Sequence, residues 1–445
     1  MSTISLPVAT TPSQEKSTKV GNYFVANYPP FGAWKPEDAP LLGDVLSRPP
    51  LPGTPLGIYA HIPFCRKRCH FCYFRVYTDK KSSEIRAYLA AMLRELDHYA
   101  KSDAFAGRKP LFVYFGGGTP SYLSIEQIRS LTDSMKAIVP WDAAQEVTFE
   151  AEPGTLQPGK LLALRDVGVT RLSLGIEHLD DAVLEANGRA HRSREVYGAY
   201  DAAKSANFSH INVDLIAGML EETDERWRET VAKTLALAPD GVTIYQMEVP
   251  YNSAIYQRMK EAGTLNSPVA DWETKRRWVA EAFQVFEAAG YTVVSATTLV
   301  KDPSKTYFYR QGLFNGTDLF SVGVSSFGYV NGVNYQNQHD FQPYLDRIDA
   351  GKLPTHRAYS LSDEERYIRE FALQLKAGTL HFAPFAAKFG VDPRVQFGEV
   401  LSAWTRRGVA SIQDGRIQLS REGLMQVDRL IFDLFLPQHR VGRFS

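Results

Sequence analysis

The chain has 445 residues, with 50 lysines and arginines against 50 aspartates and glutamates, so its formal net charge is zero. This balance provides no global basic field, which argues against nucleic acid as a partner. Hydrophobic residues make up 44% of the chain, as in ordinary globular proteins. No apolar run is long enough to span a membrane.

The N-terminal part differs in composition from the rest. Residues 1–20 are polar and aperiodic, which predicts a disordered tail. Residues 21–56 are rich in aromatic residues and prolines, and the prolines exclude a long helix. We expect an extended arm whose rings hold it against the main body. The first residues lack the basic and then apolar pattern of an export signal, so we expect a cytoplasmic protein.

A regular alternation of strands and helices is predicted from about residue 57 to 300. Short β-branched or aromatic runs alternate there with amphipathic stretches, such as the one that carries Ile85, Leu89, Met92 and Leu96 at helical spacing. This alternation predicts parallel βα units around a buried sheet, an α/β fold of the partial (β/α)6 barrel type. The expected strands are 57–62, 111–115, 146–150, 170–175, 210–216, 241–247 and 291–296.

The three cysteines of the chain all lie in the loop after the first expected strand, as Cys65, Cys69 and Cys72. Three thiolates at this spacing can hold one soft metal centre from a single loop. A 4Fe-4S cube that is held by only three cysteines keeps one iron open to another ligand. The alternative is a structural zinc site completed by His61 or His70. Zinc sites usually draw their ligands from two separated pairs, which favours the cluster.

Polar residues follow most of the expected strands. In βα barrels the chemistry collects at the carboxyl ends of the strands, so we expect these side chains to line one site. The glycines after the second strand let a backbone approach a ligand closely. The strand-end residues are Gly117, Gly118, Thr119, Glu150, Glu152, Glu177, His178, Asp214 and Glu248.

The C-terminal part has a different pattern. We expect residues 301–355 to close the barrel and residues 356–445 to form a mostly helical, winged-helix-like module. Its expected elements are a capped helix from Ser362, helices at 382–389 and 395–407, a hairpin at 412–417 with an Asp-Gly turn, and a helix at 422–436. The module has no dense basic stripe, which favours a lid or packing role over DNA binding.

The cysteine spacing, with the aromatic Phe71 before the last cysteine, and the Gly116-Gly117-Gly118 strand end resemble the radical S-adenosylmethionine superfamily. Residues 59–65, 115–120, 171–175, 187–189 and 214–218 resemble, more narrowly, the oxygen-independent coproporphyrinogen III oxidase family, over about residues 57–435. The resemblance implies a 4Fe-4S cluster whose open iron binds S-adenosyl-L-methionine (SAM). One electron from the cluster then yields a 5′-deoxyadenosyl radical. The resemblance also implies a small-molecule substrate and a reductant such as flavodoxin or ferredoxin.

The family's site residues transfer to this sequence position by position. By this resemblance, Tyr59, Gly117 and Glu150 contact a first SAM. A second SAM is surrounded by Phe71, Gly118, Thr119, Arg189 and Asp214. The sequence departs from the family at Phe74, where the oxidase has a further cysteine, and at Glu177, where glutamine is usual. It also lacks the His-Asn stretch of the haem-trafficking branch.

Three functions follow as hypotheses. The first is an oxidase-like oxidoreductase, in which the radical takes hydrogen from a tetrapyrrole propionate. The second is a methyltransferase or cyclopropanase that uses the second SAM as carbon donor, with Glu177 as proton acceptor. The third is a haem-trafficking protein without enzymatic activity. Glu177 and Glu248 are the candidate catalytic residues.

Overall fold

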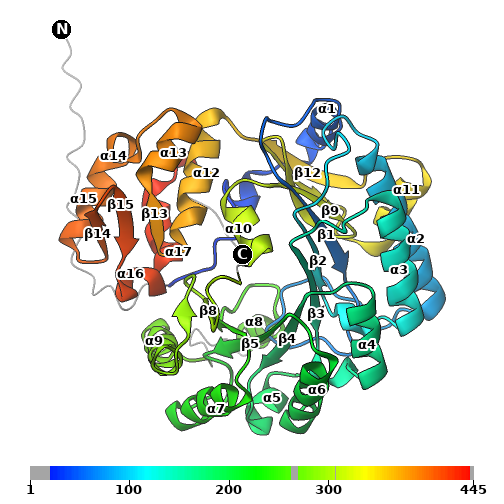
Figure 1. Ribbon diagram of the computed structural model, residues 1–445, viewed down its shortest axis with the longest axis horizontal. Helices are drawn as coiled ribbons and strands as arrows, with labels where there is room; N and C mark the ends of the chain where they lie inside the picture. Colours follow the sequence, from blue (N-terminus) through cyan, green and yellow to red (C-terminus); the bar gives the residue numbers. More distant parts are fainter. Residues whose placement is uncertain (1–20, 262–268, 306, 441–445) are drawn as a thin grey trace.

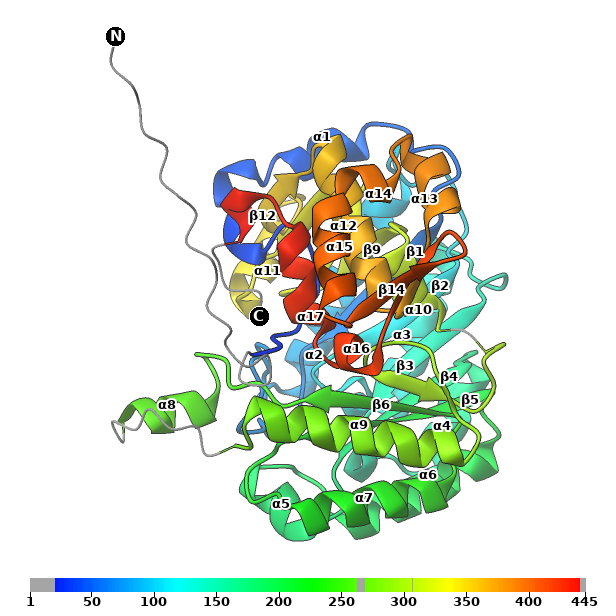
Figure 2. The same cartoon turned by 90° about the vertical axis from the view of Figure 1, so that its left-hand side faces the viewer.

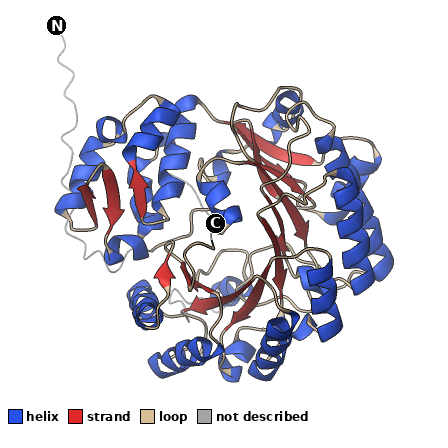
Figure 3. Ribbon diagram, in the orientation of Figure 1, coloured by secondary structure: helices blue, strands red, loops and turns tan. Residues whose placement is uncertain are grey.

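The computed structural model describes residues 21–261, 269–305 and 307–440, so the expected tail at residues 1–20 lies outside the described residues. Its main body is a twelve-stranded sheet in the order β12-β11-β10-β9-β1-β2-β3-β4-β5-β6-β8-β7. Figure 1 shows that this sheet is strongly curved, with helices along its outer side, and Figure 3 sets the strands apart from the helices.

Six consecutive parallel strands form the centre of the sheet, as the alternating pattern predicts. Each begins within one residue of its expected start, because buried β-branched runs mark strands clearly. The α/β fold is therefore confirmed. The strands are β1 Leu56–Ile62, β2 Phe112–Gly117, β3 Glu146–Ala151, β4 Arg171–Glu177, β5 His210–Ala217 and β6 Gly241–Gln246.

The helices that follow strands β1 to β5 cover the outer side of the sheet (Figure 1). The longest of them buries Ile85, Leu89, Met92 and Leu96 against the core. The next helix opens with the capping box of Ser124 and Gln127. These helices are α2 Ser82–Ala100, α3 Ile125–Ile138, α4 Pro158–Asp166, α5 Asp181–Ala186, α6 Ser193–Ala206 and α7 Asp224–Leu237. After β6 come α8 Ala254–Glu261, which projects from the body in Figure 2, and α9 Trp272–Ala288.

The two edges of the sheet differ from the expectation. The strand expected at 291–296 shrinks to β7 Thr292–Val293, and β8 Thr298–Val300 pairs antiparallel with β6. The segment expected to close the barrel instead extends the sheet beyond β1, where β9 pairs parallel to β1 and so covers its open edge. This segment contains α10 Phe308–Phe314, β9 Asp318–Val322, β10 Phe327–Val330, β11 Val333–Asn337, α11 Phe341–Asp349 and β12 Thr355–Ser360.

The N-terminal arm runs from the main body to the C-terminal module. Its rings Tyr28 and Trp34 are buried. The Tyr28 hydroxyl pairs with His439 Nδ1 at 2.8 Å, and the amide of Val25 donates to Asp428 at 2.9 Å. After two short 3-10 turns at Phe31–Ala33 and Pro36–Asp38, the arm ends in α1 Leu41–Leu46.

The C-terminal module is helical around a three-stranded sheet in the order β13-β15-β14. Its hairpin turns at Asp414 and Gly415, with φ of 50° and 70°, which is the backbone that an Asp-Gly turn favours. Figure 2 shows the module beside α9, where Arg421 pairs with Glu287 at 2.6 Å. Its elements are α12 Asp363–Leu375, β13 Thr379–His381, α13 Phe382–Phe389, α14 Pro393–Gln396, α15 Gly398–Arg406, β14 Ala410–Gln413, β15 Arg416–Leu419, α16 Arg421–Met425 and α17 Val427–Leu430.

The single helix expected at 422–436 is wrong. The chain leaves helical geometry at Gln426, where φ is −126°, and continues as α17 and a 3-10 turn at Ile431–Leu434. Beyond the break, the carboxylate of Asp428 lies 2.7 Å from the ammonium group of Lys376, the residue that follows the first helix of the module. A long-range ion pair thus accompanies a break that local helix propensity does not predict.

Replacing Lys376 with methionine is expected to lower the free energy of unfolding by about 3–5 kcal/mol, because the buried Asp428 would lose its cation. The side chains of the pair are only 4% and 5% exposed, and the Lys376 ammonium also donates to the Val25 carbonyl at 2.9 Å. Urea denaturation measures the change. Lys101→Met removes an exposed partner of Asp97 and should cost less than about 1 kcal/mol. Equal losses in the two variants would contradict a special role for the buried pair.

Candidate functional site

The cysteine loop leaves the carboxyl end of β1 and lies against the carboxyl end of β2. Backbone hydrogen bonds join the Gly118 amide to the Ile62 carbonyl at 2.9 Å and the Thr119 amide to the Phe64 carbonyl at 2.8 Å. A Cβ on Gly118 would stand 3.1 Å from Cys65 Sγ. Glycine is therefore needed here so that the strand end and the cysteine loop can approach each other.

The sulfur atoms of the loop are held by side-chain donors. Cys65 is buried, and Cys69 and Cys72 are partly exposed. Thr119 donates its hydroxyl to Cys65 Sγ at 3.3 Å, and Arg189 Nη1 donates to Cys69 Sγ at 3.2 Å. Donors aimed at sulfur favour thiolates, the form that binds metals.

Burial works against thiolates that have no metal. It raises the pKa of the Cys65 thiol to about 11 and that of the Cys72 thiol to about 12. A soft metal centre would offset this desolvation cost. Across the described residues, no group of three or more His, Cys, Asp or Glu side chains is placed to hold a single metal ion. A cluster does not need such convergence, because each cysteine would bind a different iron.

The glycine-rich end of β2 brings backbone close to the strand-end acids. Gly117 has φ of 116°, and a Cβ there would lie 2.5 Å from the ring of His61. Its amide donates to Glu150 Oε2 at 3.0 Å, and the Tyr114 hydroxyl donates to Glu150 Oε1 at 2.6 Å. The conformation of Gly117 thus helps to orient the carboxylate of Glu150.

Three of the predicted acids share one electrostatic environment. Burial, with a contribution from the charge of Asp214, raises the pKa of Glu150 to about 7. Burial likewise raises the pKa of Glu177 to about 7, against the lowering effect of Arg189, and that of Asp214 to about 6. The sheet register places them on neighbouring strands: Ser173, the β4 partner of Glu150, donates to Asp214 at 2.9 Å, and Glu177 lies beside Leu215, the residue after Asp214. Acids with such pKa values are suited to exchanging protons near neutral pH.

Glu177 forms an ion pair with Arg189. Glu177 has φ of 62°, in the left-handed region that a residue with a side chain rarely adopts. Arg189 stands 3.6 Å from Glu177 Oε1 and donates to the Gly175 carbonyl at 2.5 Å. Strained backbone at a strand end is typical of functional sites.

The other predicted residues have other partners. Glu248 accepts a hydrogen bond from the amide of Phe24 in the N-terminal arm. Glu152 pairs with Arg66 and His191; although burial raises its pKa, these partners lower it to about 2. His178 pairs with Glu222, and both side chains are fully buried. Phe71 packs against a small apolar cluster of Met247, Ile255 and Val269.

Tyr59 belongs to a stack of tyrosines that the strand pattern only partly indicates. Its ring stacks on Tyr114 at 5.7 Å, and Tyr114 stacks on Tyr309 at 4.1 Å. The Tyr307 hydroxyl reaches the Tyr114 hydroxyl at 3.2 Å, and the guanidinium of Arg310 stands over the Tyr307 ring. Tyr114 could have been found from the period-two alternation that leads to Gly116. Arg310 comes from α10, which is not adjacent in sequence to any strand end.

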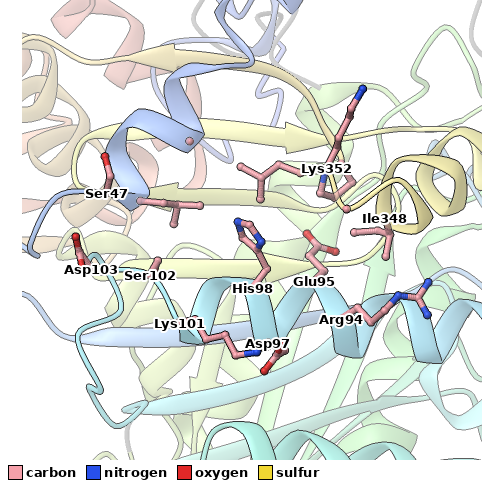
Figure 4. Close-up of a pocket in the computed structure, with 15 residues that line it drawn as sticks. Ser47, Arg94, Glu95, Asp97, His98, Lys101, Ser102, Asp103, Ile348 and Lys352 are labelled. Carbon is pink, nitrogen blue, oxygen red and sulfur yellow. Dashed lines mark hydrogen bonds and ion pairs between the residues drawn. The ribbon is translucent and has the colours of Figure 1, made fainter.

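A separate surface groove of about 590 Å³ is lined by residues of α1, α2 and the end of α11 with the turn that follows it. Figure 4 shows Glu95 and His98 of α2 pointing from the helix into the groove, whereas Lys352, which follows α11, points away from α2. Its lining contains no cysteine and none of the strand-end carboxylates. The carboxylate of Glu95 is already satisfied by donors that include Tyr99 and Tyr344. The groove therefore adds nothing to the candidate site.

Comparison with known proteins agrees with this geometry. Residues 59–233 match the Radical SAM superfamily. The haem chaperone HemW of Bacillus subtilis is 27% identical over 85% of this chain and 99% of its own. The oxygen-independent coproporphyrinogen III oxidase of Escherichia coli is 26% identical over 88% of this chain and 89% of its own.

A solved structure, that of coproporphyrinogen III oxidase HemN from Escherichia coli, a radical SAM enzyme, covers 92% of this chain and 96% of its own at a TM-score of 0.79. At 22% identity this likeness establishes the fold. No described helix is long and apolar enough to cross a bilayer.

Proposed function

We propose that this chain, which carries a radical SAM domain, reductively cleaves SAM and uses the resulting radical to take hydrogen from an organic substrate. The observation that carries the proposal is the placement of Cys65, Cys69 and Cys72. They are the chain's only cysteines, and they share one loop packed on the glycine end of β2. A bound 4Fe-4S cluster supplies the electron that breaks the sulfonium bond.

The residues around Glu150 suit the methionine end of SAM. The carboxylate of Glu150 is oriented by Gly117 and Tyr114, and an ammonium group beside it would favour the ionised form and lower its raised pKa. Tyr59 lies in the same stack as Tyr114 and offers an aromatic face. Tyr59, Gly117 and Glu150 are our proposed contacts for the first SAM.

The substrate class follows from the oxidase likeness and from one cation. Arg310 is anchored by Ser295 at 2.9 Å and stands 4.8 Å from the Tyr307 ring centre. A guanidinium fixed beside tyrosine faces suits a substrate that carries pyrrole rings and a carboxylate, because it can bind the carboxylate in two places. We therefore infer a tetrapyrrole-type substrate and an oxidase-like oxidoreductase reaction.

A second candidate function is carbon transfer from a second SAM, and Glu177 favours it. Its carboxyl lies beside Arg189, it interacts with Asp214, and its pKa is raised to about 7. Arg189 can pair with the methionine carboxylate. A carboxylate with this pKa can take up the proton that a methyl-derived intermediate must lose.

The two functions differ in their products. The protein is reconstituted without oxygen with iron and sulfide, reduced, and supplied with methyl-labelled SAM and porphyrinogens or haem. Deoxyadenosine without S-adenosylhomocysteine would support hydrogen abstraction alone. Both products, with label in the substrate, would support carbon transfer. Tight stoichiometric haem binding without either product would instead support a haem-trafficking role.

If Glu177 accepts the proton in carbon transfer, turnover should rise with pH through about 7, because only the ionised carboxylate can act as the base. Glu177→Gln should lose this rise and turn over about 10²-fold more slowly. The pH–rate profile of labelled product measures both effects. Glu185→Gln changes an acid that is 74% exposed and should keep the wild-type profile. An unaltered profile in Glu177→Gln would remove Glu177 from this role.

A further inference from the structure

One guanidinium joins the cysteine loop to the strand-end acids. Arg189 Nη1 donates to Cys69 Sγ at 3.2 Å, while Nη2 lies 3.6 Å from Glu177 Oε1. The side chains of Arg189 and Glu177 are only 11% and 13% exposed, so water screens their charges weakly. Arg189 Nε is buried without a hydrogen-bond partner among the described residues. The guanidinium thus has unused donor capacity close to both groups.

The contact with sulfur has an electrochemical consequence. Hydrogen bonds to the sulfur ligands and nearby positive charge stabilise the more negative, reduced state of an iron–sulfur cluster and so raise its reduction potential. Within residues 21–261, 269–305 and 307–440, the side chains that donate to a cysteine sulfur are Thr119 and Arg189. Thr119 is neutral, whereas an arginine is always charged. Arg189 is therefore the donor with the larger effect.

We propose that Arg189 transmits a change in charge, at Glu177 or on a molecule bound beside Arg189, to the reduction potential of the cluster. The hydrogen bond from Arg189 to Cys69 carries this effect. This inference rests on the proposed function, since it requires the cluster. The carboxylate of Glu177 competes with Cys69 for the guanidinium. Neutralising Glu177 strengthens the bond to sulfur and raises the potential. A carboxylate from a molecule bound beside Arg189 weakens that bond, lowers the potential and makes the reduced cluster a stronger reductant.

The test is a redox titration of the reconstituted cluster, followed by the electron paramagnetic resonance signal of the reduced form. At a fixed solution potential, Arg189→Gln should lower the ratio of reduced to oxidised cluster about tenfold, equivalent to about 59 mV for one electron. Glu177→Gln should raise the ratio. Arg192→Gln is the matched control, because Arg192 is a nearby cation that is 35% exposed and pairs with Glu185; it should leave the ratio unchanged.

The double variant separates a relayed effect from a direct one. If Glu177 acts through Arg189, then Glu177→Gln should shift the potential much less when Arg189 is already glutamine. Equal shifts in both backgrounds would overturn the coupling, as would an Arg189→Gln cluster with the wild-type potential. Arg189→Gln could fail to hold a cluster. In that case, the coupling is still overturned if the reduction potential of the Glu177→Gln cluster is equal to or below that of the wild type. A wild-type protein that forms no cluster would overturn the proposed function and this inference together.

Discussion

Replacing Cys69 with alanine is expected to abolish both the iron–sulfur absorption and the formation of 5′-deoxyadenosine. The chain contains no other cysteine beyond Cys65 and Cys72 that could substitute as a ligand. Two thiolates leave too much of a cube without protein ligands. The substitution also removes the sulfur that Arg189 contacts at 3.2 Å. Iron and sulfide content per chain, together with deoxyadenosine after dithionite reduction, measures the loss.

Lys67→Ala is the control for this prediction. Lys67 is exposed on the same loop, between the first two cysteines. Its replacement removes a surface charge and no ligand, so iron content and SAM cleavage should remain near the wild-type level. Far-ultraviolet circular dichroism establishes that Cys69→Ala is folded. A folded Cys69→Ala protein that still cleaves SAM at the wild-type rate would refute the radical assignment.

Gly117→Ala is expected to lose SAM binding and about 2–5 kcal/mol of stability, from left-handed strain and overpacking together. A Cβ at this position, where φ is 116°, would lie 2.5 Å from the buried ring of His61. The strand end would have to move, and the amide that holds Glu150 Oε2 at 3.0 Å would move with it. Urea denaturation measures the stability, and equilibrium dialysis of the reconstituted protein measures SAM binding.

Gly107→Ala separates backbone strain from the steric clash. Gly107 also has positive φ, at 65°, but a Cβ there would meet nothing within 4 Å. Its replacement should cost about 1 kcal/mol from the left-handed backbone alone and leave SAM binding intact. Equal losses of stability and of SAM binding in Gly117→Ala and Gly107→Ala would show that the close approach between His61 and the end of β2 is not needed for either property.

The elements predicted correctly from the sequence are those with a local cause. The strands β1 to β6 appear as short buried runs, and the hairpin at Asp414 carries its turn type in two residues. The helix expected at 422–436 fails for the opposite reason. Its path beyond Gln426 brings Asp428 to Lys376, a residue fifty-two positions away, and no local pattern reports such a partner.

The residues of the candidate site were also predicted only in part. Glu150, Glu177 and Asp214 were predicted to lie together, because the carboxyl ends of parallel strands share one edge of a sheet. Glu248 was assigned to the same group by this rule, yet it accepts a hydrogen bond from the N-terminal arm. Arg310 was not assigned there, since it reaches the tyrosine stack from α10.

By itself, the sequence determined the α/β fold, the single cysteine loop and the order of acids along the strand ends. These features depend on residues that are near each other in the chain or on the regular geometry of parallel strands. Only the tertiary structure decided that β9 extends the sheet beyond β1 and that Arg189 lies between Cys69 and Glu177. Such contacts join segments that are far apart in sequence. Their formation depends on the packing of the whole molecule, which local periodicity does not encode.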